Sequence, residues 1–128
     1  RRAIYIFVKR SLVLPLMANF DFADVDSSCP VRFTTTQPTQ SLSLLNSEFA
    51  NRQADIFADS LRKRSPDDLP AQIQRALNQV TQRRVTGEEI NRGVQLVAQL
   101  IETGASEQEA LKYFCLVSYN LNEFLYVD

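Results

Sequence analysis

Residues 86–114 read TGEEINRGVQLVAQLIETGASEQEALKYF and contain two helix-start signals in succession. Thr86 stands three residues before Glu89, and Ser106 stands three residues before Glu109. In this arrangement, the capping box, the hydroxyl and the carboxylate satisfy each other's free backbone N–H groups in the first turn of a helix. The stretch therefore predicts one helix that begins at Thr86 and a second that begins at Ser106.

Apolar residues recur at helical spacing through most of the chain outside this stretch. Gly104 suits the left-handed residue just past a helix end, and Pro38 suits the first turn of a helix. The predicted helices cover residues 38–45, 47–64, 69–80, 86–103 and 106–121. Their inward-facing stripes predict a core that contains Phe57, Leu77, Val94, Val97, Phe114 and Val117.

The N-terminal part of the chain has a different character. Residues 3–8, AIYIFV, are continuously apolar, aromatic and β-branched, which favours a buried strand. Residues 21–37 are rich in Asp, Ser, Thr and Pro and indicate an irregular connector. We therefore predict a mostly α, bundle-like domain of four to five helices with an N-terminal extended segment. Residues 1–37 form the strand and connector, and residues 38–128 form the helical domain.

Composition excludes several classes of function. The 128 residues include 14 basic and 15 acidic side chains, for a formal net charge of −1, which argues against a strongly basic surface for nucleic acid. There is no histidine, so Ser-His-Asp and Cys-His catalysis, His-ligated zinc and a conventional c-type haem are excluded. The three glycines stand apart and form no phosphate-binding loop. No apolar run approaches the roughly 20 residues of a membrane span. We predict no catalytic residue and no cofactor for this chain on its own.

The two cysteines, Cys29 and Cys115, allow two interpretations. They are either separate buried thiols that act as small apolar groups or a disulfide that clamps the N-terminal part to the last helix. A disulfide would require an oxidising compartment.

One acidic group is the weak candidate for a metal site. Asp21, Asp24 and Asp26 lie close together in the irregular connector, and hard cations such as Ca²⁺ prefer oxygen ligands. The EF-hand pattern fails, because Cys29 and Thr35 occupy the positions that need Gly and Glu. Asx-turns and helix caps explain the same carboxylates without a metal. We therefore expect no metal here.

Three stretches together resemble a known group of proteins. They are residues 1–11 (RRAIYIFVKRS), residues 20–49 (FDFADVDSSCPVRFTTTQPTQSLSLLNSEF) and residues 120–128 (NLNEFLYVD). They resemble the C-terminal end of large planctomycete proteins in which a planctomycete-type cytochrome c domain is followed by two domains of unknown function. The chain is similar to the final part of the second such domain. The resemblance implies an exported protein, periplasmic or at the cell surface, whose upstream domains are partners of this part. It supplies no catalytic residues.

Three hypotheses of function follow from these observations. The first is a non-catalytic structural or interaction module that closes a larger exported protein. The second is a contribution by Asp21, Asp24, Asp26 and Arg32 to a hydrolase or metal site completed by upstream residues. The third is a glycan or small-ligand site that uses Tyr5, Phe20, Phe22 and Tyr126. We favour the first, because the chain has strong helix signals and lacks the usual catalytic motifs.

Overall fold

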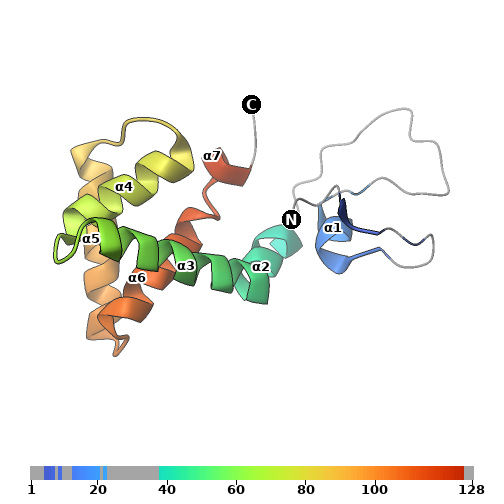
Figure 1. Ribbon diagram of the computed structural model, residues 1–128, viewed down its shortest axis with the longest axis horizontal. Coiled ribbons are helices and arrows are strands. Elements are labelled where there is room, and N and C mark those ends of the chain that lie inside the picture. The colour runs from blue at the N-terminus through green and yellow to red at the C-terminus, as the bar shows by residue number, and fades with distance from the viewer. Residues whose placement is uncertain (1–4, 8, 10–12, 21, 23–37, 126–128) are drawn as a thin grey trace. The chain divides into compact units, whose positions relative to one another are not determined.

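The computed structural model describes residues 5–7, 9, 13–20, 22 and 38–125 (Figure 1). Within these residues the chain forms seven helices and no strand. It divides into two compact units, Arg1–Leu44 and Leu45–Asp128. The organisation expected above, with a helical domain that begins at residue 38, stays a prediction.

The first unit contains helix α1 (Pro15–Asn19) and most of helix α2 (Pro38–Asn46). Pro15 opens α1, where its missing N–H group costs nothing. Two polar contacts join the helices: Asn19 Nδ2 donates to Ser43 Oγ at 2.6 Å, and Gln40 Nε2 donates to the Asn19 carbonyl at 2.9 Å. Gln40 is almost fully buried, so its amide needs such a partner.

The buried strand expected at residues 3–8 is wrong for the part of it that the structure describes. Tyr5, Ile6 and Phe7 form no strand, and the side chains of Tyr5 and Phe7 are 74% and 82% exposed. A strand requires a partner for its backbone N–H and C=O groups, and the described residues contain no second strand for these three. An apolar run without periodicity indicates burial, but it does not indicate which segment would pair with it as a neighbouring strand.

The second unit is built from α3 (Glu48–Arg64), α4 (Leu69–Thr81), α5 (Gly87–Glu102), α6 (Glu107–Ser118) and the short α7 (Asn122–Leu125). These helices confirm the predicted mostly α fold. Helix α6 packs against α3, α4 and α5, and α4 also contacts α3, α5 and α7 (Figure 1). None of the described helices combines the length and apolar character that crossing a membrane requires.

Local caps define where these helices begin and end. Both predicted capping boxes are confirmed: Glu89 N donates to Thr86 Oγ1 at 3.3 Å while Thr86 N donates to the Glu89 carboxylate at 2.7 Å. Ser106 and Glu109 make the same pair of bonds at 3.3 and 3.0 Å. Gly104 has a φ of +104°, which explains glycine there, because other residues are strained in this region.

The core of the second unit agrees with most of the predicted stripes. Phe57, Leu77, Val97 and Phe114 are buried, and Val94 is partly buried against them. The prediction for Val117 is wrong, because its side chain is 44% exposed. Helix α6 has neighbours on three sides, so its buried surface is broad and includes Leu111, Cys115, Leu116 and Ser118. The sequence stripe therefore identified Phe114 correctly but extended too far round the helix, to Val117.

Candidate functional site

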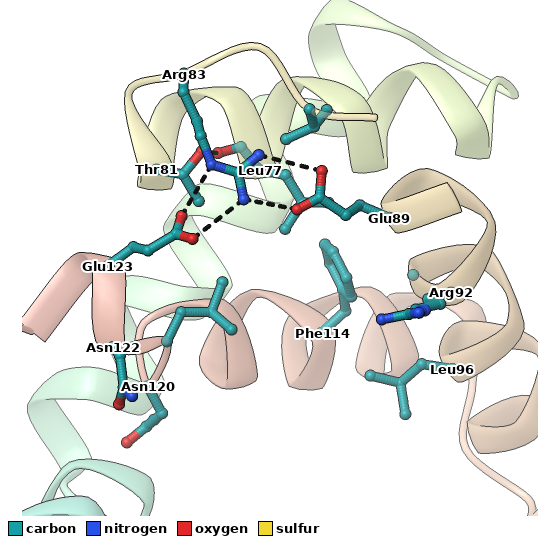
Figure 2. Close-up of a pocket in the computed structure, with 13 residues that line it drawn as sticks. Leu77, Thr81, Arg83, Glu89, Arg92, Leu96, Phe114, Asn120, Asn122 and Glu123 are labelled. Carbon is teal, nitrogen blue, oxygen red and sulfur yellow. Dashed lines mark hydrogen bonds and ion pairs between the residues drawn. The ribbon is translucent and has the colours of Figure 1, made fainter. Parts of the chain in front are cut away.

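The second unit contains a pocket of about 590 Å³ between α4, α5, α6 and α7 (Figure 2). Its apolar lining comes from Leu77, Leu96, Phe114 and Leu121. Arg83 and Glu123 stand at one side of it, on the segment after α4 and on α7. The size falls within the range of small-ligand pockets, so the polar groups decide what the pocket can do.

Arg83 joins two carboxylates that are far apart in the sequence. Its Nη1 and Nη2 donate to Glu89 Oε2 and Oε1 at 3.1 and 2.6 Å. Its Nε and Nη2 donate to Glu123 Oε2 and Oε1 at 3.1 and 3.2 Å. Figure 2 shows the guanidinium between the two carboxylates, with Glu89 on α5 and Glu123 on α7.

The guanidinium of Arg83 has little capacity left for a ligand. A guanidinium carries five N–H donors, and Nη1 of Arg83 also donates to the Arg84 carbonyl at 3.4 Å. The five contacts to Glu89, Glu123 and Arg84 therefore account for its donors. Arg83 is therefore committed to holding the protein's own helices together.

The chain conformation between α4 and α5 places Arg83. Gln82 closes α4 in the left-handed region, with a φ of +55°. Two residues after Arg83, Val85 N donates to Asn78 Oδ1 at 3.0 Å, which ties the connecting segment back to α4. The capping box of α5 then presents the carboxylate of Glu89 toward Arg83.

The electrostatics of Arg83 and Glu89 favour an ion pair over proton transfer between them. The hydrogen bond from Arg83 is the main reason why the pKa of Glu89 falls to about 2, and the bonds from the backbone and hydroxyl of Thr86 lower it further. The same pair of carboxylates raises the pKa of Arg83 above its usual range. A general acid or base works best with a pKa near the working pH, so Glu89 is suited to capping and ion pairing.

A second pocket, of about 400 Å³, lies between the end of α3, the start of α4, the end of α5 and the start of α6. Arg62 lines it and forms an ion pair with Asp59 on the same helix. Its Nη1 is enclosed and has no hydrogen-bond partner among the residues that the structure describes. The lining of this pocket combines the aliphatic side chains of Leu69, Val97, Ile101 and Leu111 with the polar residues Asp67, Gln72 and Glu107.

Cys115 lies in the core on α6 and forms no disulfide with any residue that the structure describes. Burial raises the pKa of its thiol to about 12, against a smaller opposing effect of the Arg62 charge. Because the thiolate is the nucleophile, this thiol is not activated for catalysis. The alternative of a bridge to Cys29 stays a prediction, because Cys29 lies outside the described residues.

The candidate metal ligands and most of the candidate ligand-binding residues are not placed by the structure. Asp21, Asp24, Asp26, Arg32 and Tyr126 lie outside the described residues, so the predictions about them stay open. Among the described residues, no group of three or more His, Cys, Asp or Glu side chains is arranged to hold a metal ion.

The aromatic residues that the structure does describe in the first unit are exposed. Tyr5, Phe20 and Phe22 are 74%, 37% and 38% exposed. Phe22 N donates to the Met17 carbonyl at 3.1 Å, which holds this residue just after α1.

Sequence reasoning predicted the capping role of Glu89 but missed its link to Glu123 through Arg83. No local signal connects Arg83 to Glu123, which lies 40 positions further along the chain.

Comparison with known proteins places the chain in a family. Residues 1–97 match the family PSD1, described as a protein of unknown function (DUF1553). This is more than half of the chain, which therefore belongs to that family. No curated protein and no solved structure matches the chain significantly.

Proposed function

We propose that this member of the DUF1553 family is a non-catalytic interaction module, which closes a larger exported protein by docking on that protein's upstream part. The main support for this proposal is an apolar edge on α3. It is formed by Phe49 and Ile56, whose side chains are 67% and 55% exposed. The two residues lie about two helical turns apart and so share one side of α3. The opposite side of the helix is already packed in the core through Ala54, Ala58 and Leu61.

The energetics support a docking role for this edge. Full burial of a side chain such as Phe or Ile stabilises an interface by about 1.5–3 kcal/mol. Exposed apolar residues that stand singly need no explanation. Because Phe49 and Ile56 share one side of α3, we infer that they belong to one contact surface. The nature of the partner rests on the resemblance of residues 1–11, 20–49 and 120–128 to the end of large planctomycete proteins with a cytochrome c domain. Export, to the periplasm or the cell surface, rests on the same resemblance.

The charged groups near the pocket also fit a structural role. Arg83 bridges the carboxylates of Glu89 and Glu123 and so connects the start of α5 to α7. Such an arrangement stabilises the end of a domain, whereas a catalytic pair would keep a donor or acceptor free for substrate.

The proposal is tested by adding the upstream part of the parent protein to this chain and measuring binding by calorimetry. We expect the double variant Phe49→Ser/Ile56→Ser to keep the wild-type helix content and to bind at least tenfold more weakly, since about 1.4 kcal/mol corresponds to a factor of ten. A matched double variant, Arg52→Ser/Lys63→Ser, changes exposed polar positions of the same helix and should bind like the wild type. Equal binding by the Phe49/Ile56 variant, or no binding by the wild type, would overturn the proposal.

A further inference from the structure

Helix α7 depends on its tertiary contacts for its position. It contains only four residues, Asn122–Leu125, and none of them is buried. An isolated helix of this length has no stability of its own in water, because the cost of nucleation exceeds the gain from so few hydrogen bonds.

The contacts that hold α7 are few and lie near the surface. Glu123 pairs with Arg83, and their side chains are 52% and 42% exposed. The ring of Phe124 lies 5.4 Å from that of Tyr119, while Phe124 itself is 48% exposed. Ions in solution screen exposed pairs of this kind, so the attachment weakens as ionic strength rises.

The two carboxylates on Arg83 differ in how they respond to the loss of that contact. Glu89 also accepts hydrogen bonds from the backbone N and hydroxyl of Thr86, at 2.7 and 3.0 Å. The start of α5 therefore keeps its capping box without Arg83. The carboxylate of Glu123 is held by Arg83 in the part of the chain that the structure describes.

The position of α7 also affects the larger pocket. Asn122 and Glu123 line it together with Leu77, Phe114 and Leu121 (Figure 2). If α7 moves away, we expect the apolar lining formed by Leu77 and Phe114 to become more accessible.

From these observations we propose that α7 is a strap whose closure over the pocket depends on the Arg83–Glu123 ion pair and is weakened by salt, while α5 stays in place. The pocket lining is then accessible in proportion to the fraction of molecules with α7 released. Low ionic strength favours the closed arrangement, and high ionic strength favours the open one.

Amide hydrogen exchange on the whole chain provides the test. The amides of Phe124 and Leu125 donate to the Leu121 carbonyl at 2.9 and 3.1 Å, so they report directly on α7. We expect their exchange to accelerate about two- to fivefold between 20 mM and 500 mM NaCl, which is the size expected for loss of one exposed ion pair. The amide of Val97 in the core of α5 should not change.

Variants separate this ion pair from a general effect of salt. Glu123→Gln should exchange at the high-salt rate already in 20 mM NaCl and should lose the salt dependence at Phe124 and Leu125. The control is Glu88→Gln, which removes the exposed Glu88–Arg92 pair of α5 and should leave α7 as in the wild type. The proposal fails if salt and Glu123→Gln leave the two amides unchanged, or if Val97 accelerates together with them.

Discussion

Gly93 on α5 lies so close to Ile73 on α4 that a Cβ atom at position 93 would be 2.6 Å from Ile73 Cγ2. The same atom would lie 3.0 Å from Cε2 of Phe114 on α6. Glycine is therefore required here by the close approach of three helices, and not by backbone conformation. This contact sets how closely α5 packs on its neighbours in the second unit.

Gly93→Ala should destabilise the second unit by up to about 2 kcal/mol, because overpacking a core usually costs about 1–3 kcal/mol. The gain of up to about 1 kcal/mol in helix propensity offsets only part of this cost. The measurement is chemical denaturation followed by circular dichroism. Gly87→Ala is the matched control, because a Cβ at Gly87 meets no atom within 4 Å. If Gly93→Ala were as stable as Gly87→Ala, the close packing of α4 and α5 would be wrong.

The two capping boxes should each contribute measurably to stability. Thr86→Ala and Ser106→Ala remove the hydroxyls that accept from Glu89 N and Glu109 N, and each should cost about 1 kcal/mol. Gln108→Ala, at an exposed position in the first turn of α6, should change the free energy of unfolding very little. Equal stability of all three variants would argue against the caps.

Phe114 and Val117 lie on the same helix but should respond very differently to truncation. Phe114 is 4% exposed, so Phe114→Ala should cost about 3–5 kcal/mol through lost burial and a residual cavity. Val117 is 44% exposed, and Val117→Ala should stay within about 0.5 kcal/mol of the wild type. A large loss of stability for Val117→Ala would show that Val117 is buried, as the sequence stripe predicts.

Glu89 should make stability depend on pH in the acid range. Its pKa falls from a usual 4.5 to about 2 on folding, so the stabilisation is fully present above pH 4.5 and is lost as pH falls toward 2. Hydrogen bonds from Ser106 lower the pKa of Glu109 as well. Protonation of Glu109 therefore also lowers the stability of the folded protein as pH falls. Thermal melts between pH 6 and pH 2 should therefore show a smaller decrease in Tm for Glu89→Gln than for the wild type. An identical slope for Glu88→Gln and Glu89→Gln would contradict this assignment.

Cys115 should be unreactive while the protein is folded. The pKa of its thiol rises from 9.0 to about 12, which lowers the thiolate fraction at pH 8 by a factor on the order of 10³. A Cys29→Ser variant isolates Cys115, and its reaction with a thiol reagent should be slower than in denaturant by at least that factor. Because the folded pKa is the higher one, this group's stabilisation is present below pH 9 and is lost as pH rises toward 12. Fast labelling of the folded variant would show that Cys115 is accessible.

Most helix boundaries of this protein could be predicted from the sequence, because they depend on contacts between residues three or four positions apart. Thr86 with Glu89, Ser106 with Glu109, and Gly104 are signals of this kind, and all were found where they were expected. The capping role of Glu89 in the candidate site was predictable for the same reason.

The tertiary structure alone decided where the buried side of α6 ends and which distant charges meet. Val117 continues a regular apolar stripe, yet its side chain is exposed, because α6 packs on its neighbours through the side that carries Leu111, Cys115 and Ser118. Arg83 and Glu123 form an ion pair because the packing of α4 and α7 brings them together. Helix caps follow from local hydrogen bonding, whereas long-range contacts follow from how the apolar surfaces of all the helices are buried together, which no single segment specifies.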